Sequence, residues 1–253
     1  MAKQTKGFCK YCGKEYTRSG MVKHLVSCKE RIRVLEQAKE TTAWYELALY
    51  GKYDKDYWLV IQIKESATFK DLDQFIRDIW VECCGHLSAF ELYGQRYETL
   101  PNKDSFWGEP AKSMNCKLQN VLEQGMQMEY EYDYGSTTEL LIEVRDHYQA
   151  PNQKDKSMIL SRNNPPQYVC SRCGKNIATW IYLEGFLDGD PFWCDECLEK
   201  YENETQDAAE EDEEYDFDTD FLSRICNSPR MGVCGYDGSS RYPDQFEPDK
   251  IEK

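Results

Sequence analysis

Two groups of four residues have the types and the spacing of metal ligands. The first group, Cys9, Cys12, His24 and Cys28, follows the pattern C-x2-C-x11-H-x3-C. A C-x2-C pair makes a knuckle with both thiolates on one side, and residues four apart share one face of a helix. The pattern predicts a zinc site; the alternative is a chance cluster of thiols in a basic helical hairpin. About twenty residues with so few apolar side chains would not fold without a metal.

The second group is the most specific signal in the sequence. Its residues, Cys170, Cys173, Cys194 and Cys197, follow the pattern C-x2-C-x20-C-x2-C. Two such knuckles, separated by a hairpin that we expect at residues 178–183, are typical of a zinc ribbon. Ribbons of this kind mostly have structural or protein-docking roles. Together the two groups predict two zinc ions per chain.

A further set of reactive side chains lies in the middle of the chain. His86 and Asp133 would form an acid–base pair if the fold brings them together. Cys83, Cys84 and His86 could also begin a metal site, although adjacent cysteines rarely chelate one ion well. The alternative is a helix end at which the thiols are buried and His86 bonds to backbone carbonyls. The sequence has no nucleophile elbow, phosphate loop or metalloprotease motif, so we assign no catalytic residue.

Charge is divided unevenly along the chain, whose formal net charge is −15. Residues 1–40 contain ten Lys or Arg and four Asp or Glu, whereas residues 202–220 contain eleven acidic residues and no basic one. The N-terminal module is therefore a candidate for phosphate contacts on DNA or RNA, or else a solvated basic face of a structural finger. The candidate contact residues are Lys10, Lys14, Arg18, Lys23 and Arg31. Because one finger reads only about three base pairs, sequence-specific binding by this module alone is not expected.

The elements that must position these side chains lie between the two metal groups. Residues 58–63 are β-branched and aromatic and predict a strand. Further strands are expected at residues 43–50, 89–93, 126–134 and 139–146. Apolar residues at helical spacing in 71–81, after a cap at Thr68, predict a helix. This order predicts an α+β fold: a small, mostly antiparallel sheet with a helix across one face, flanked by an N-terminal C2HC zinc finger and a C-terminal four-cysteine zinc ribbon.

Several residues of the central region match a recurring motif. They are Trp80, His86, Phe90, Asp133 and Gly135. In these residues the chain resembles the plasmid pRiA4b open-reading-frame-three-like family, whose members are also labelled insertion-element passenger proteins. That family usually has an acid after the glycine and then a Trp and a His, where this chain has Ser136, Thr138 and Leu140. The resemblance extends from about residue 57 to about residue 240 and indicates a branch with added zinc-binding cysteine modules; it implies a fold and no established reaction.

The same features divide the chain into six parts. They are the finger with its basic helix (1–40), the central domain (41–148), a linker (149–167) in which residues 158–160 could pair as an edge strand, the ribbon (168–201), an acidic disordered linker (202–220) and a docked C-terminal segment with a tail (221–253). The acidic run has an alternative role, either as a mimic of nucleic acid or as a cover for the basic finger. Residues 227–236 are expected to fold back onto the central domain, with Arg230 facing one of its acids or a ligand. Cys226 and Cys234 are expected to be buried thiols, with a third metal site or a disulfide as alternatives.

Composition also bears on compartment and function. No stretch of about 18 apolar residues occurs and the N-terminus lacks an apolar signal core, so we expect a cytoplasmic protein without a membrane span. Twelve cysteines in that compartment are more naturally metal ligands than disulfides. The predicted function is a zinc-binding, non-enzymatic adaptor or nucleic-acid-associated protein, with an unknown protein partner, nucleic acid at the finger, or both. The alternative is a hydrolase or nucleic-acid-processing enzyme that uses His86 and Asp133.

Overall fold

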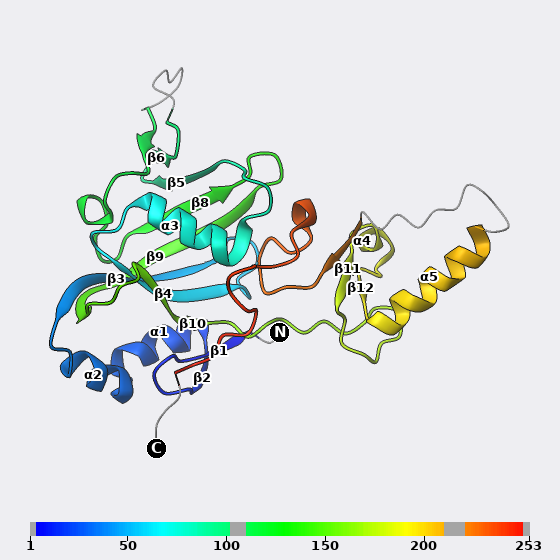
Figure 1. Cartoon of the computed structure of the whole chain (residues 1–253), viewed down its shortest axis with the longest axis horizontal. Coiled ribbons are helices and arrows are strands. Elements are labelled where there is room, and N and C mark those ends of the chain that lie inside the picture. Colours follow the sequence, from blue (N-terminus) through cyan, green and yellow to red (C-terminus); the bar gives the residue numbers. More distant parts are fainter. Residues whose placement is uncertain (1–3, 102–109, 210–220, 250–253) are drawn as a thin grey trace.

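An eight-stranded sheet forms the centre of the molecule (Figure 1). The structure is a computed structural model that describes residues 4–101, 110–209 and 221–249. The strands, in the order in which they pair, are β10 (Ser157–Arg162), β4 (Trp58–Lys64), β3 (Thr41–Gly51), β9 (Thr138–Pro151), β8 (Gln127–Tyr132), β5 (Ser88–Leu92), β6 (Gln95–Glu98) and β7 (Lys112–Ser113). Every neighbouring pair is antiparallel except β6 and β7. The predicted α+β class is confirmed, and the sheet has more strands than the small sheet that we expected.

One face of this sheet is covered by α3 (Phe69–Ile76), which continues as a π-helical turn, η1 (Arg77–Val81) (Figure 1). The helix begins at a capping box, in which the Thr68 hydroxyl accepts from the amide of Asp71 and the Asp71 carboxylate accepts from the amide of Thr68. Its apolar residues pack with alternate residues of β3, β4, β8 and β9 in one core. The expected helix across one face is therefore confirmed. A 3-10 turn, η2 (Leu118–Asn120), precedes β8.

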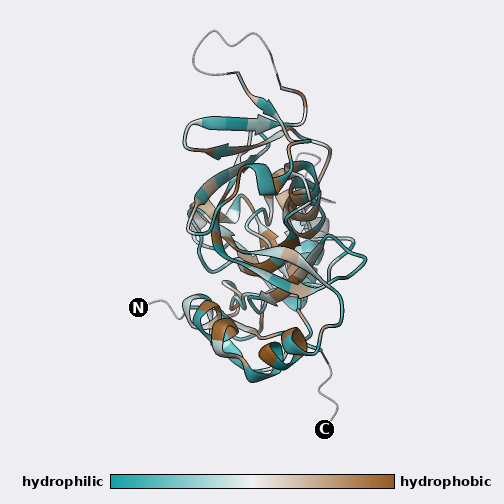
Figure 2. Ribbon diagram, turned by 90° about the vertical axis from the view of Figure 1, so that its left-hand side faces the viewer, coloured by the Kyte–Doolittle hydropathy of each residue, from teal (hydrophilic) through white to brown (hydrophobic). Residues whose placement is uncertain are grey.

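The N-terminal module covers the opposite face of the sheet at its β10–β4–β3 end. Its elements are β1 (Lys6–Phe8), β2 (Glu15–Thr17), α1 (Arg18–Ser27) and α2 (Lys29–Glu36). Met21 and Leu25 of α1 pack with Trp58 and Val60 of β4 in a second buried cluster. β3 and β4 are therefore buried on both faces, whereas β8 alternates between buried and more exposed residues. Figure 2 shows hydrophobic residues on the central strands and on the two N-terminal helices.

The second cysteine-rich module is built around a three-stranded sheet. Its elements are β11 (Trp180–Tyr182), α4 (Gly185–Asp188), β12 (Phe192–Trp193), α5 (Asp195–Ala209) and β13 (Leu222–Arg224). β11 pairs with β12 on one side and with β13 on the other. The hairpin expected at 178–183 is therefore wrong, because that segment supplies one strand and takes a partner from beyond the acidic run.

The C-terminal segment after β13 lies against the central domain (Figure 1). Nε1 of Trp80 donates to the carbonyl of Asn227 at 3.1 Å, and the Ser228 hydroxyl donates to the carbonyl of Trp80 at 2.6 Å. Asn163 directly follows β10, and its Nδ2 donates to Oδ1 of Asn227 at 2.7 Å. A 3-10 turn, η4 (Val233–Gly235), follows. These buried polar contacts make the segment part of the central fold.

Three predicted boundaries differ from the structure. β9 runs to Pro151, and β10, which begins at Ser157, is the edge strand that residues 158–160 were expected to allow, so much of the expected linker at 149–167 belongs to the sheet. α5 runs to Ala209, so the first part of the expected acidic linker at 202–220 is helical, and residues 210–220 lie outside the described residues. The basic helix expected in 1–40 is two helices, which meet at Cys28. In the described parts of the chain, no helix combines the length and the apolar character needed to cross a membrane.

Candidate metal centres

The first predicted ligand set converges in the N-terminal module. Cys9 and Cys12 lie between β1 and β2, His24 lies on α1, and Cys28 lies where α1 meets α2. The four ligand atoms all lie within 4.8 Å of one another. The Sγ atoms of Cys9 and Cys28 are 3.9 Å apart, and Sγ of Cys12 is 3.2 Å from Nε2 of His24. A tetrahedral zinc ion with Zn–S bonds of about 2.3 Å places two sulfurs about 3.8 Å apart, so this arrangement fits zinc.

Local interactions hold these ligands in place. The left-handed conformation of Gly13 (φ +64°) closes the knuckle, and its amide donates to the carbonyl of Cys9 at 2.9 Å. Tyr16 stacks on His24 with ring centroids 4.2 Å apart. Burial, assisted by Lys14, lowers the pKa of His24, which favours the neutral imidazole that binds metals. Burial also raises the pKa of Cys9 to about 12, an effect that a bound cation reverses.

The second predicted set converges in the ribbon. The ligand atoms of Cys170, Cys173, Cys194 and Cys197 all lie within 4.8 Å of one another. The Sγ atoms of Cys173 and Cys194 are 4.0 Å apart, which is close to the edge of a zinc tetrahedron. Both predicted ligand sets are therefore brought together at distances compatible with metal binding.

Backbone amides favour the thiolate form of one ribbon cysteine, which is the form that binds metals. Amides of Asn176 and Lys175 lower the pKa of Cys173 to about 6, so the thiolate form is favoured near neutral pH. The side-chain amide of Asn176 also lies 3.6 Å from Sγ of Cys194. These donors lie around the ligand atoms, where they would orient and support a bound ion.

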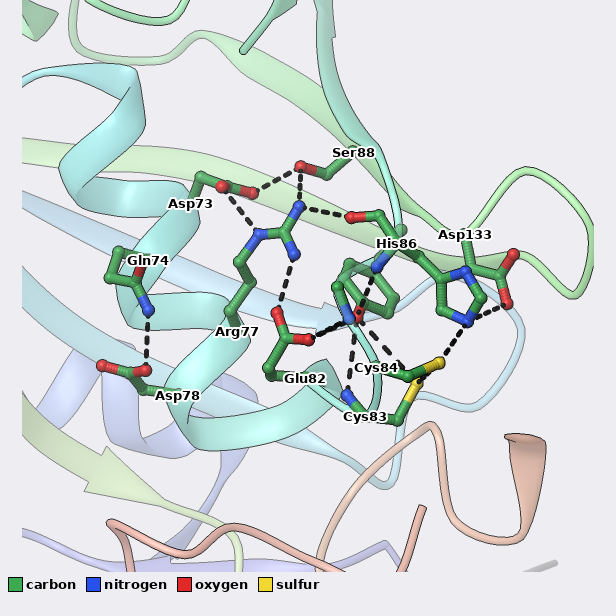
Figure 3. Close-up of polar contacts among 12 residues, drawn as sticks. Asp73, Gln74, Arg77, Asp78, Glu82, Cys83, Cys84, His86, Ser88 and Asp133 are labelled. Carbon is green, nitrogen blue, oxygen red and sulfur yellow. Dashed lines mark hydrogen bonds and ion pairs between the residues drawn. The ribbon is translucent and has the colours of Figure 1, made fainter. Parts of the chain in front are cut away.

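A third cluster of ligand-type side chains joins two segments that are distant in the sequence. Cys83, Cys84 and His86 lie on the loop after η1, and Cys234 lies in η4; their ligand atoms are all within 4.8 Å of one another. Sγ of Cys84 is 3.6 Å from Sγ of Cys83 and 3.7 Å from Sγ of Cys234. Nε2 of His86 is 3.0 Å from Sγ of Cys84 and 3.5 Å from Sγ of Cys234. Figure 3 shows the imidazole between the loop sulfurs and Asp133.

We expected the thiols of Cys83, Cys84, Cys226 and Cys234 to be buried, and this prediction is wrong for two of the four. Cys84 and Cys234 are exposed, whereas Cys226 is buried as predicted. Nε2 of His86 faces sulfur atoms rather than backbone carbonyls. The sequence offered Cys83, Cys84 and His86 as the possible start of a metal site, and a third metal site as an alternative for Cys234, but nothing in the spacing linked Cys234 to the other three residues.

His86 and Asp133 do lie together, with 3.5 Å between Nε2 and Oδ2. The same carboxylate oxygen accepts a 2.7 Å hydrogen bond from the fully buried Arg230, whose guanidinium lowers the pKa of Asp133 to about 2. Asp133 has a left-handed backbone (φ +66°), and its Oδ1 accepts from the amide of Gly135 at 3.0 Å. The Asp-x-Gly motif therefore forms a turn and binds Arg230, and its ionised carboxylate is a weak proton acceptor near neutral pH.

Arg77 fixes the loop that carries the third cluster (Figure 3). Its guanidinium donates to Asp73 at 2.8 Å and to Glu82 at 2.7 Å. It also donates to the carbonyl of His86 at 2.7 Å and to the hydroxyl of Ser88 at 2.8 Å. Sequence reasoning missed Arg77, because an arginine on an amphipathic helix usually lies in solvent.

Arg31, which the sequence suggested as a phosphate contact, is buried inside the protein. Its side chain is 4% exposed, and its Nη2 lies 2.7 Å from Oε2 of Glu46 on β3, which is 2% exposed. The guanidinium also lies over the ring of Tyr148, 4.7 Å from the centroid. Arg31 thus joins α2 to the sheet.

The other candidate phosphate contacts differ in their surroundings. The Arg18 guanidinium lies over the ring of Tyr50, 3.7 Å from its centroid. Nζ of Lys10 pairs with Asp249 at 2.6 Å. The two remaining candidates, both exposed, are Lys14 and Lys23.

Comparison with known proteins identifies the central region. A family model described as "Plasmid pRiA4b ORF-3-like protein" matches residues 47–174. The solved structures include a similar chain, described as a protein of unknown function, MM3350, from Methanosarcina mazei Go1, with 21% identity and a TM-score of 0.39 over 47% of this chain and 67% of that one. No curated protein matches the chain. The finger and the C-terminal segment lie outside the family match.

Proposed function

The chain belongs to the plasmid pRiA4b ORF-3-like family, and we propose that it is a zinc-binding, non-enzymatic adaptor whose finger and ribbon each hold one structural zinc ion. The observation that carries this proposal is the spacing of the ligand atoms in those two modules. Thiolate and imidazole donors suit zinc, and their separations of 3.2–4.0 Å are near the edges of a zinc tetrahedron.

The two modules present different surfaces to partners. The finger carries the exposed lysines Lys14 and Lys23, which suit the phosphate backbone of a nucleic acid. The ribbon exposes large apolar side chains, which suit an apolar face of a protein partner. These side chains, with their exposed fractions, are Val169 (55%), Ile177 (50%), Phe186 (56%) and Leu187 (93%). An adaptor of this kind would link a nucleic acid at one end to a protein at the other.

Metal content tests the zinc sites. We expect elemental mass spectrometry of the purified, reduced protein to find at least about two zinc ions per chain, because each site supplies four ligands. Cys12→Ser in the finger and Cys173→Ser in the ribbon should each remove one ion. Cys116→Ser is the matched control, since Cys116 lies outside the three described ligand clusters. Fewer than two zinc ions in the unaltered protein would refute the two-site proposal.

Affinity capture tests the adaptor role. The tagged protein is recovered from its native cell with and without nuclease treatment, next to the variants Leu187→Glu and Lys23→Glu. A protein partner lost with Leu187→Glu but kept after nuclease would support docking on the ribbon. Nucleic acid lost with Lys23→Glu would support binding by the finger. Recovery unaffected by either substitution would contradict both assignments.

A hydrolase is the second candidate, because His86 lies 3.5 Å from Asp133. In that role Nε2 of His86 would carry the proton that faces Asp133, and Nδ1 would accept the substrate proton, so Nε2 could not ligate a metal at the same time. The test is a nuclease and phosphatase screen of the unaltered protein and of His86→Ala. The control is His147→Ala, which removes another half-exposed histidine paired with a carboxylate, Glu65. Activity that survives His86→Ala would exclude this role for His86.

A further inference from the structure

We infer that Cys83, Cys84, His86 and Cys234 form a third zinc site, which exists only when the C-terminal segment is docked on the central domain. The sulfur–sulfur separations are 3.6 and 3.7 Å, against about 3.8 Å in a zinc tetrahedron. The nitrogen–sulfur separations are 3.0 and 3.5 Å, against about 3.6 Å for the same geometry. The match is as good as in the finger and the ribbon, although the sequence pointed only to the three loop residues as a group and not to their contact with Cys234.

A buried arginine supplies a hydrogen-bond donor to one sulfur of such a site. Three thiolates and a neutral imidazole around Zn²⁺ leave one negative charge in excess. Nη2 of the buried Arg230 lies 3.5 Å from Sγ of Cys83 and donates to this sulfur, which stabilises its thiolate, while the charge of the guanidinium is shared with the ionised Asp133. Arg230 is itself held by Asp133 at 2.7 Å and by the Thr138 hydroxyl at 3.0 Å. Arg230 and Cys234 therefore come to the site together, on the same segment.

The loop is held in the ligating shape from within the central domain. Arg77 donates to the carbonyl of His86, and Glu82 accepts from the amide of Gly85 at 2.6 Å. The Tyr132 hydroxyl donates to Glu82 at 3.1 Å and lies 3.3 Å from the amide of His86. The ligands of the loop thus need little rearrangement to receive an ion, which lowers the entropy cost of binding.

Exposure separates this site from the other two. Cys84 and Cys234 are exposed, and the His86 side chain is 30% exposed, whereas the finger and the ribbon each have two buried cysteines. Zinc at the third site should therefore exchange faster and leave first under a chelator. Because β13 of the ribbon sheet directly precedes the segment that carries Cys234, an ion at this site would also tie the ribbon to the central domain.

The decisive experiment counts zinc by native mass spectrometry of the full, reduced chain after equilibration with zinc. We expect three ions in the unaltered protein, two in Cys84→Ser and in Cys234→Ser, and three in the control Cys116→Ser. Cys84 is exposed, so its replacement disturbs no packing. Two ions in the unaltered reduced protein, or three in Cys84→Ser, would overturn the inference.

Two further measurements separate this site from the others. The zinc counts of Cys12→Ser and Cys173→Ser report on the finger and the ribbon. They are therefore independent of the zinc count of Cys84→Ser, which reports on the third site. For the link to docking, a protease site is placed in residues 210–220 and the chain is cut there. The C-terminal fragment should be released faster from Cys234→Ser than from Cys116→Ser when both are loaded with zinc. Equal release rates would refute the coupling between metal binding and docking.

Discussion

Arg31 and Glu46 form a buried ion pair that fastens the finger to the central sheet, with 2.7 Å between Nη2 and Oε2 and less than 5% of either side chain exposed. Arg31 lies on α2 and Glu46 on β3, so the pair bridges two parts of the chain that the sequence presents as separate modules. A finger held in this way is a fixed part of the fold rather than a mobile appendage, and its orientation is set by the sheet.

Removal of one partner of this pair should destabilise the protein strongly. In Glu46→Gln the Arg31 guanidinium stays buried without a counter-charge, for which about 3–5 kcal/mol of unfolding free energy is the usual cost. Replacement of both residues, Arg31→Met with Glu46→Leu, should recover much of that loss. Urea unfolding measures the difference. The control is Glu30→Gln, which breaks the exposed pair with Arg33 and should cost less than about 1 kcal/mol.

Gly7→Ala should loosen the contact between the finger and the sheet. A Cβ atom at this position would lie 2.0 Å from the backbone oxygen of Arg162 and 2.9 Å from the Trp58 ring. Backbone cannot give way there, so we expect a loss of about 1–3 kcal/mol or more in urea unfolding. Gly20→Ala is the control: it lies in α1, its Cβ would meet neighbours at 3.3 Å or more, and alanine favours helix. Equal stabilities of the two variants would contradict the close approach.

Asp71→Asn should destabilise the protein in a way that depends on pH. Burial raises the pKa of Asp71, but hydrogen bonds from Lys156 and Thr68 outweigh it, so the net pKa is lowered. A lowered folded-state pKa means that the stabilisation is present above the unfolded value of about 3.9 and is lost as pH falls through the folded value. We therefore expect a loss of about 0.5–2 kcal/mol at neutral pH that shrinks toward zero in acid.

The measurement is urea unfolding of Asp71→Asn and the unaltered protein between neutral and acid pH, reported as the difference at each pH. Asp155→Asn serves as the control, since Asp155 is an exposed aspartate beside Lys156. A difference for Asp71→Asn that stays constant across this range would exclude the carboxylate as its source.

If the finger binds nucleic acid, the exposed lysines should carry the binding. In the double variant Lys14→Glu and Lys23→Glu we expect weaker binding and a shallower salt dependence, by about 0.7–0.9 in the log–log slope for each lost phosphate contact. Fluorescence anisotropy with single- and double-stranded oligonucleotides at several salt concentrations measures both. The control, Lys154→Glu with Lys175→Glu, makes the same charge change on other exposed lysines. An equal effect of the two double variants would show that net charge alone is responsible.

Arg31 is not part of that test, because charge reversal at this buried position would place two acids together and unfold the finger. A separate experiment tests whether the acidic run affects nucleic-acid binding by the finger. Deletion of residues 210–220 should strengthen binding if the run covers the basic finger, and should leave it unchanged otherwise.

Local chemistry and covalent spacing were enough to predict several features from the sequence. The candidate ligands of the finger and the ribbon lie in C-x2-C knuckles or on one face of a helix, so their convergence needs little beyond local backbone geometry. The helix after Thr68 could also be predicted from local sequence, because its capping box and its helical spacing of apolar residues lie within one segment. The family membership followed from motif residues in the same central region.

Tertiary structure alone decided the rest, because those contacts join residues far apart in the chain. The third cluster needs Cys234 beside Cys83 and Cys84, and only docking of the C-terminal segment brings them within reach. The burial of Arg31 depends on the sheet that lies against α2, and α2 by itself is a polar helix. The periodicity of a sequence reports which face of an element is apolar; which distant element covers that face, and which charges meet there, is set by the packing of the whole chain.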